Sequence, residues 1–243
     1  MMDSIILAGG FAKRMWPLTK DAPKQLLDVG GKPMLQHVIE SLENIAPERI
    51  IISVNSFFAT QFQNFIDDYG GSMNLQLHVE PSMSEEEKPG ALGALHLLFK
   101  EWKIKGPAFI AGGDNLSDFD LSRMVSVSRN TGKDVIGLYD VKDVELAKLY
   151  GIVRTDGDCI TDFVEKPSEP PSTLAATAYW LLSESGISHF FDYIESGGDR
   201  DAMGNFLAWN VKRNDVRSVA FIGTWYDVGG LESYEDAQKW LSA

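Results

Sequence analysis

The sequence predicts an α/β protein, a three-layer sandwich built on a mostly parallel, mixed sheet. Three observations support this class. Short β-branched runs alternate with stretches of helical periodicity over the first 140 residues. The 243 residues are 44% hydrophobic, enough for a sizeable core. After about residue 141 the alternation gives way to closely spaced short strands. Strands separated by helices usually pair in parallel, with both sheet faces covered.

The alternation can be followed from the N-terminus. Apolar, β-branched runs predict strands over 4–8, 49–54, 75–79, 108–111 and 134–141. Apolar residues at helical spacing predict helices over 35–45, 58–69, 92–102 and 121–128. A strand is thus followed by a helix four times, which is the repeating unit of a parallel sheet.

The C-terminal part predicts a different pairing. Segments 150–154 and 159–164 flank Thr155-Asp156-Gly157-Asp158, a turn sequence typical of a β-hairpin. Further strands are expected over 176–182 and 218–222, and helices over 187–195, 206–212 and from 232 onwards. We expect one domain, 1–243, in two halves that meet near residue 141.

Charge and composition exclude several functions. The formal charge of −13 argues against a nucleic-acid or anionic-membrane surface. A single cysteine, Cys159, cannot form an internal disulfide, and the four histidines lack metal-ligand spacing. Asp3 and the Gly9-Gly10 pair interrupt any signal-peptide core, and no apolar run reaches about 18 residues. We therefore expect a soluble, cytoplasmic protein.

The loop after the first strand is the most informative segment. Gly9 and Gly10 lack Cβ atoms, so backbone N–H groups there can approach an anion closely. Residues 9–27 hold four basic side chains and one aspartate, a local charge of +3 within an acidic chain. The basic residues are Lys13, Arg14, Lys20 and Lys24. This pattern predicts a phosphate site; the alternative is a glycine turn followed by solvated lysines.

Two aspartates each follow an apolar strand and adjoin a pair of glycines. Asp114 comes after Gly112-Gly113, and Asp227 precedes Gly229-Gly230. Ligands bind at the carboxyl ends of parallel strands, and two carboxylates suit Mg²⁺, which keeps waters and takes further oxygens from phosphates. Each aspartate by itself is also typical of an ordinary turn.

Four motifs together resemble the sugar-phosphate nucleotidyltransferase family, which includes glucose-1-phosphate thymidylyltransferases and other NDP-sugar pyrophosphorylases. They are Leu7-Ala8-Gly9-Gly10 followed by Arg14 and Pro23-Lys24, then Pro89-Gly90, then Gly112-Gly113-Asp114, and then Phe163-Val164-Glu165-Lys166-Pro167. The resemblance implies a Rossmann-like fold. It also implies Mg²⁺-dependent transfer of a nucleotidyl group from a nucleoside triphosphate to a sugar 1-phosphate, such as a hexose 1-phosphate.

The resemblance also implies a role for each matching residue. Arg14 and Lys24 would be catalytic; Leu7, Gly9, Gly10, Glu80 and Gly90 would bind the nucleotide; Tyr150, Gly151, Glu165 and Lys166 would bind the sugar phosphate; Asp114 and Asp227 would hold Mg²⁺. The nucleotide-binding half would then be about 1–141 and the sugar-binding half about 142–243. Pro167 predicts an extended backbone at Lys166.

The chain also departs from the family pattern. Ala12-Lys13 replaces the usual Gly-Thr before the arginine, and Ala91-Leu92 replaces the usual Thr-Ala after Gly90. Glu80 replaces a glutamine of thymidylyl- and some uridylyltransferases, and an acceptor-only carboxylate fits a guanine edge better. The family resemblance favours dTTP or UTP as the nucleotide, with GTP as a further possibility. It identifies neither the hexose nor the oligomeric state, for which a homo-oligomer is one possibility.

Two other functions compete with this one. A glycosyltransferase that uses a finished nucleotide sugar would share the aspartate–metal edge, but it needs less positive charge than Arg14 and Lys24 supply. A catalytically silent nucleotide or sugar sensor would show no turnover. Pyrophosphate release separates the proposed enzyme from both alternatives. Because the sequence stops soon after a terminal amphipathic helix, we expect no β-helix acyltransferase domain.

Overall fold

The computed structural model of the protein describes residues 2–242. The chain forms two compact units. Among the described residues, the N-terminal unit comprises 2–89, 111–120 and 223–242, and the central unit comprises 90–110 and 121–222. Residues 90–110 and 121–141 belong to the predicted N-terminal half, about 1–141. In the structure they fold in one unit with residues 142–222. The expectation of one domain over 1–243 stays a prediction.

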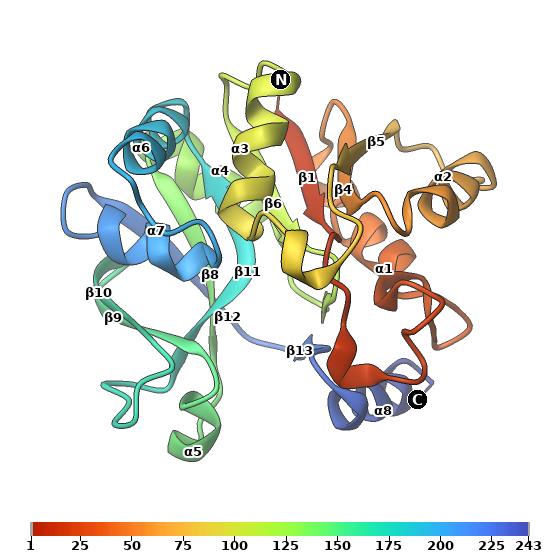
Figure 1. Cartoon of the computed structure of the whole chain (residues 1–243). Helices are drawn as coiled ribbons and strands as arrows, with labels where there is room; N and C mark the ends of the chain where they lie inside the picture. The colour runs from red at the N-terminus through yellow and green to blue at the C-terminus, as the bar shows by residue number, and fades with distance from the viewer. Residues whose placement is uncertain (1, 243) are drawn as a thin grey trace. The chain divides into compact units, whose positions relative to one another are not determined.

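Three parallel strands organise the N-terminal unit. They are β1 (Asp3–Leu7), β4 (Ile50–Asn55) and β5 (Leu75–Glu80), in the order β5-β4-β1 (Figure 1). All six residues of β4 are buried, as expected for a strand with a neighbour on each side and both faces covered. The helices of this unit are α1 (Met34–Ser41), α2 (Ala59–Asp67) and α8 (Leu231–Leu241).

Short elements complete the N-terminal unit. They are the 3-10 helices η1 (Lys13–Met15), η2 (Lys24–Leu26), η3 (Glu43–Ile45) and η4 (Glu85–Glu87), and the paired strands β2 (Asp28–Val29) with β3 (Lys32–Pro33) and β7 (Asn115–Ser117) with β13 (Trp225–Asp227). Only η3 lies within a predicted element, the helix expected over 35–45. The sequence does not predict the others, because two or three residues are too few to show a hydrophobic period. Four of them, η1, η2, β7 and β13, contain or adjoin candidate site residues.

The central unit is built around β8 (Asp134–Asp140), which pairs in parallel with β12 (Val216–Phe221) and antiparallel with β11 (Leu174–Leu182). β9 (Gly151–Asp156) and β10 (Cys159–Glu165) form the predicted hairpin (Figure 1). The helices are α3 (Ala91–Glu101), α4 (Ser122–Thr131), α5 (Val144–Ala147), α6 (Glu184–Glu195) and α7 (Met203–Asn210), and β6 (Ala108–Gly112) begins in this unit and ends in the other.

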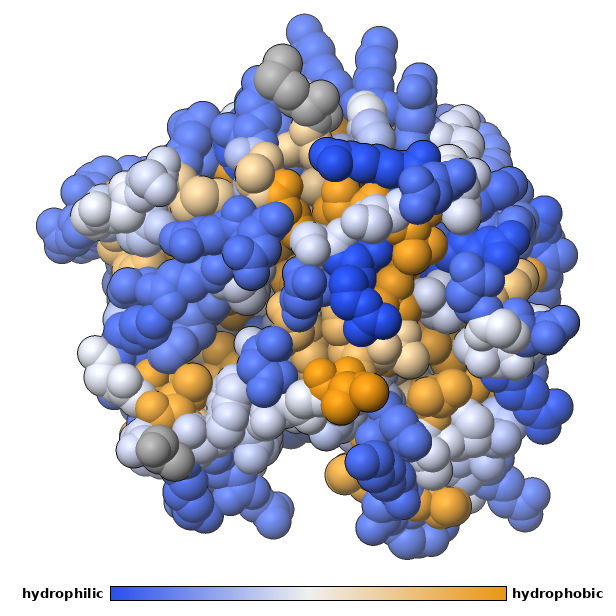
Figure 2. All heavy atoms as spheres, turned by 180° about the vertical axis from the view of Figure 1, so that it is seen from behind, coloured by the Kyte–Doolittle hydropathy of each residue, from blue (hydrophilic) through white to orange (hydrophobic). Residues whose placement is uncertain are grey.

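The predicted α/β class with a mixed sheet is confirmed. The N-terminal unit shows parallel pairing along β1, β4 and β5, whereas most pairings of the central unit are antiparallel. Among these antiparallel pairs, a short turn directly connects β9 and β10. Figure 2 shows one face of the molecule, on which hydrophilic side chains stand out around apolar ones. Among the helices of residues 2–242, none combines the length and apolar character needed to cross a membrane.

Candidate active site

The two predicted metal aspartates converge in the N-terminal unit. Asp114 directly precedes β7, and Asp227 ends β13, where it lies opposite Asn115 in the antiparallel register. The side-chain amide of Asn115 donates hydrogen bonds to Oδ1 of Asp114 at 3.1 Å and to Oδ1 of Asp227 at 3.3 Å. One amide group thus holds two carboxylates that are more than a hundred residues apart in the sequence.

Lys24 joins this carboxylate pair from η2. Its side chain is only 10% exposed, and Nζ donates to Asp114 Oδ2 at 2.7 Å and to the carbonyl of Val228 at 2.6 Å. Burial by itself raises the pKa of Asp114, but the Lys24 ammonium and the hydrogen bond from Asn115 hold that pKa below its ordinary value. Asp114 is therefore an anion at neutral pH, and it balances the buried lysine.

The donor set fits a hard divalent cation. The Oδ1 atoms of the two carboxylates both lie within 3.3 Å of the same amide nitrogen, and Mg²⁺ takes few protein ligands when waters and phosphates supply the rest. Within residues 2–242 there is no cluster of three or more histidine, cysteine, aspartate or glutamate side chains arranged for a metal. Asp114 and Asp227 are therefore the residues to test as ligands.

Arg14 lies near the same segment. It is an exposed residue of η1, and its Nη2 lies 3.4 Å from where a Cβ on Gly229 would be. The Gly229 N–H donates to the Asp227 carbonyl at 2.8 Å, so this segment folds back directly behind the aspartate. The structure thus brings together Arg14, Lys24, Asp114 and Asp227, four residues that separate sequence motifs point to.

Glu80, the last residue of β5, packs against the glycine loop. Glu80 is buried, with 3% exposure, and accepts a hydrogen bond from the Ser53 hydroxyl at 2.9 Å. Burial raises the pKa of Glu80, and the Ser53 bond partly offsets that rise. A Cβ on Gly9 would lie 2.6 Å from Glu80 Oε1, so any other residue there would force this buried carboxylate to move. Leu7, which ends β1, accepts at its carbonyl from Gly113 N–H at 2.9 Å.

Replacing Gly9 by alanine should therefore damage the loop. We expect the free energy of unfolding to fall by about 1–3 kcal/mol, the usual cost of overpacking a tight site. Urea denaturation measures the change. Gly10→Ala is the matched control: no atom lies within 4 Å of a Cβ there, and we expect a change below about 0.5 kcal/mol. Equal losses for the two variants would contradict the assigned contact.

Gly90 lies in the central unit, directly before α3. Its φ is +76°, and a Cβ would collide with the backbone of Arg200 and Asp201. The first N–H groups of α3 donate to this same backbone: Ala91 to the Asp201 carbonyl at 2.7 Å and Leu92 to the Arg200 carbonyl at 3.0 Å. Packing alone thus requires a glycine at position 90, and its contact with a nucleotide stays a prediction.

The four candidate sugar residues gather at the hairpin of the central unit. Lys166 N–H donates to the Tyr150 carbonyl at 3.0 Å. This bond joins the residue before β9 to the residue after β10. A Cβ on Gly151 would lie 3.0 Å from Glu165 Oε2 and against the Phe163 ring, so the glycine leaves room for that carboxylate. Glu165 and Lys166 are both exposed, and Lys166 Nζ lies 3.9 Å from Glu165 Oε1.

The expected extended backbone at Lys166 is wrong. Its φ is +43°, in the left-handed region that non-glycine residues seldom adopt. The hydrogen bond from Lys166 N–H to Tyr150 holds the chain there as it leaves β10, and this tertiary contact overrides the local preference set by Pro167. Strained residues of this kind often occur at functional sites.

Three further residues contribute to these sites. Asn115 bridges the two aspartates, and Ser53 binds Glu80. Gly204 in α7 makes room for Glu165, since a Cβ there would lie 2.6 Å from Glu165 Oε2. Asn115 follows Asp114 directly and is the one with a sequence signal, an amide beside a candidate metal carboxylate. Ser53 and Gly204 carry no local signal.

A family model described as nucleotidyl transferase matches residues 3–243. The chain belongs to this family. A UTP–glucose-1-phosphate uridylyltransferase of Haloferax volcanii is 32% identical over 183 residues, which cover 75% of this chain and 72% of the relative. The mannose-1-phosphate guanylyltransferase catalytic subunit beta of Drosophila pseudoobscura pseudoobscura is 33% identical over 229 residues, 93% of this chain and 58% of the relative.

Solved structures share the fold of this family member over 98–100% of its length. A crystal structure of a Bacillus anthracis protein assigned as a glucose-1-phosphate thymidylyltransferase superposes with a TM-score of 0.82 at 25% identity, covering 100% of this chain and 96% of the other. An apo UDP-glucose pyrophosphorylase matches with a TM-score of 0.82 at 21% identity and supports the fold alone. The chain spans about three fifths of the length of the guanylyltransferase relatives. The predicted family resemblance is confirmed.

Proposed function

We propose that this protein transfers a nucleotidyl group from a nucleoside triphosphate to a sugar 1-phosphate and releases pyrophosphate. The observation that carries the proposal is the convergence of Lys24, Asp114 and Asp227 around Asn115, beside the glycine loop. A buried ammonium and two carboxylates suit phosphoryl chemistry, in which charge must be neutralised in a fixed geometry. The glycosyltransferase alternative does not account for this family membership.

The reaction is an in-line displacement at phosphorus. A phosphate oxygen of the sugar 1-phosphate forms a bond to the α-phosphorus of the triphosphate. The bond from that phosphorus to the oxygen that bridges the α- and β-phosphates breaks. Pyrophosphate leaves with the electron pair, and no covalent enzyme intermediate is required. Both substrates are anions, so the protein must first overcome their repulsion and then hold them in line.

The residues of the N-terminal unit divide this work. Lys24, fixed by Asp114 and the Val228 carbonyl, presents a preorganised positive charge. Arg14, exposed beside Gly229, can clamp the β- and γ-phosphates, and the N–H groups around Gly10 can receive phosphate oxygens. Asp114 and Asp227 would hold Mg²⁺, which when bound supplies positive charge to the phosphate oxygens and the leaving pyrophosphate.

The nucleotide is proposed to be GTP or UTP. The relatives include a UTP-dependent uridylyltransferase and several guanylyltransferases that act on mannose 1-phosphate. A carboxylate at position 80 would suit guanine, which offers two adjacent N–H donors, but Glu80 is buried and accepts from Ser53, so the named relatives carry this proposal. The hexose is proposed to be glucose or mannose, and dTTP is the third nucleotide to examine in view of the thymidylyltransferase fold match.

The decisive experiment is a substrate panel. Purified protein is mixed with Mg²⁺, one of GTP, UTP, dTTP, CTP or ATP, and glucose, mannose or N-acetylglucosamine 1-phosphate, and pyrophosphate is measured. We expect release with one triphosphate preferred and with a strict requirement for the sugar phosphate. Absence of release from every pair would contradict the proposed enzyme and favour a silent sensor.

Lys166 is predicted to serve the sugar phosphate. Lys166→Ala removes a compact charge beside Glu165 on the exposed hairpin, so we expect the KM for the sugar 1-phosphate to rise about ten-fold while the KM for the triphosphate changes less than about two-fold. Steady-state kinetics with each substrate varied measures both. Lys148→Ala, which changes a partly exposed lysine of the central unit that also pairs with a glutamate, is the control. Equal losses for both substrates would place Lys166 elsewhere in the reaction.

A further inference from the structure

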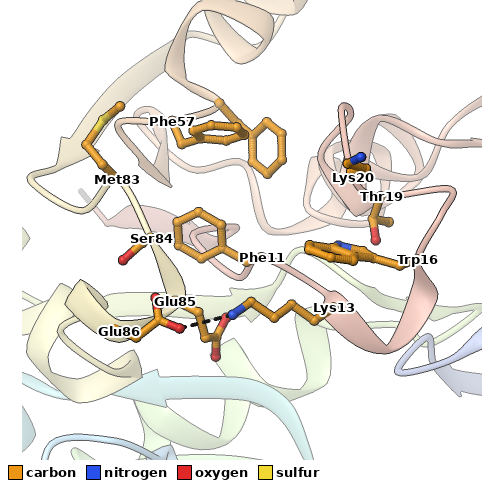
Figure 3. A pocket seen from close by; sticks show the side chains of 11 residues that line it. Phe11, Lys13, Trp16, Thr19, Lys20, Phe57, Met83, Ser84, Glu85 and Glu86 are labelled. Atoms are coloured by element: carbon orange, nitrogen blue, oxygen red, sulfur yellow. Dashed lines mark hydrogen bonds and ion pairs between the residues drawn. The ribbon is translucent and has the colours of Figure 1, made fainter.

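A small pocket beside the glycine loop of the N-terminal unit has an ion pair among its lining residues. Its lining combines aromatic and apolar side chains with polar and charged ones, and Lys13 and Glu86 pair there (Figure 3). The lining residues include Phe11, Trp16, Phe57, Phe58 and Met83. The cavity is about 130 Å³, well below the few hundred Å³ of a typical ligand pocket, so a nucleotide does not fit inside it. The ion pair is therefore its informative feature.

Lys13 is part of the phosphate loop. It begins η1 directly before Arg14, and Ala12, in the left-handed region with φ +49°, turns the chain into η1. The Lys13 side chain is 47% exposed. Its neighbour Arg14 reaches Gly229, in the segment that carries Asp227. A long, exposed ammonium at this position can reach an anion bound at the loop.

Glu86 reaches Lys13 from a separate segment. It lies in η4, and its Oε1 is 3.2 Å from Lys13 Nζ (Figure 3). The neighbouring glutamates have other partners: Glu85 pairs with Lys88 at 2.8 Å, and Glu87 accepts from the Met83 N–H at 2.8 Å. Backbone and Ser84 hydrogen bonds, and then Lys13, lower the pKa of Glu86, so it is ionised at neutral pH.

The two anions that can pair with Lys13 differ in strength. The Glu86 carboxylate carries one charge and is 74% exposed, and exposed ion pairs contribute little. A triphosphate carries several charges on oxygens that accept strong, charge-assisted hydrogen bonds. A bound triphosphate should therefore displace Glu86, but it must break this contact first.

We propose that Lys13 is an additional phosphate-binding residue of the loop, and that Glu86 competes with the triphosphate for its ammonium. This inference rests on the proposed function, because it assumes that a triphosphate binds at the loop. It assigns a role to Lys13, at which the chain departs from the family pattern, and to one of three consecutive glutamates. Glu86 would set how tightly the triphosphate binds without touching it.

The test measures binding of GTP, UTP and inorganic tripolyphosphate, each with Mg²⁺, by isothermal titration calorimetry at low and at near-physiological salt. Glu86→Gln should tighten binding about three-fold at low salt, and Lys13→Met should weaken it about ten-fold. Glu87→Gln removes the same charge one residue away and should change affinity less than about 1.5-fold. In a Lys13→Met background, Glu86→Gln should have no effect, since its action passes through the lysine.

The outcomes separate this inference from the function on which it rests. If the wild type binds none of the three probes and releases no pyrophosphate in the substrate panel, both are wrong. If the wild type binds a probe or releases pyrophosphate, but Glu86→Gln and Glu87→Gln have the same affinity for the probes, then only the competition between Glu86 and the triphosphate is wrong. This holds whether both variants bind more tightly than wild type or neither does. An effect of Glu86→Gln that persists without Lys13 also contradicts it. Thermal denaturation checks that these exposed substitutions leave the fold unchanged.

Discussion

Asp114→Asn and Asp227→Asn are each expected to lower Mg²⁺-dependent pyrophosphate release by about 10²–10³-fold. Each substitution removes one negative charge from the pair held by Asn115 and leaves the side-chain volume nearly unchanged. An amide oxygen is a weaker ligand than a carboxylate for a hard cation, and loss of one preorganised charge at such a site has effects of this size. The measurement is kcat/KM at saturating and at limiting Mg²⁺.

A third variant controls for this result. Asp118→Asn makes the same chemical change at the other end of the β7–β13 ribbon, where the carboxylate accepts from Thr224 N–H at 2.8 Å. We expect its activity to stay within about two-fold of wild type. If both Asp114→Asn and Asp227→Asn turned over normally, the assignment of the metal ligands would be wrong. Raised Mg²⁺ should partly restore activity only where a ligand has been weakened.

Lys24→Met is expected to lower turnover by about 10²-fold or more and also to destabilise the protein. The ammonium donates to Asp114 and to the Val228 carbonyl from a nearly buried position. Its removal leaves a largely buried carboxylate without its cation. Breaking a fully buried pair costs about 3–5 kcal/mol, and because the Asp114 side chain is 28% exposed we expect about 2–3 kcal/mol. Urea unfolding and the pyrophosphate assay measure the two effects.

Lys32→Met provides the matched control. Lys32 pairs with Glu40 in the same unit, but both side chains are roughly one third exposed, so we expect a loss below about 1 kcal/mol and normal activity. If Lys24→Met lost no more free energy of unfolding than Lys32→Met, the buried Lys24–Asp114 pair would not stabilise the fold. Stable protein with normal turnover would remove Lys24 from the catalytic machinery altogether.

The pH dependence of the Lys24–Asp114 pair has a definite sign. The pKa of Asp114 is lowered in the folded state, so the stability contributed by the pair is present above the pKa of the unfolded chain, about 3.9. It is lost as the pH falls through the lowered folded value. In Lys24→Met the burial of Asp114 remains and its cation is gone, so its pKa should rise. The variant should therefore lose less stability than wild type in acid, as urea unfolding at several pH values would show.

Local sequence patterns were sufficient to predict the fold class and the main elements. The largely apolar, β-branched run of β4 and the turn before β10 are such patterns, and local sequence is enough to recognise them. The same kind of pattern identified the glycine loop with its cations and the two glycine-flanked aspartates. These signals survive without a structure because each depends on residue types a few positions apart.

The way those residues meet could not be predicted, because it depends on tertiary contacts. The convergence of Asp114 with Asp227 depends on the register between β7 and β13, two three-residue strands that are too short to show a period. The burial of Lys24 depends on the Val228 carbonyl, 204 positions away. The left-handed backbone of Lys166 depends on Tyr150. Side-chain convergence is set by contacts between segments distant in the chain, and residue types and their local spacing do not encode that register.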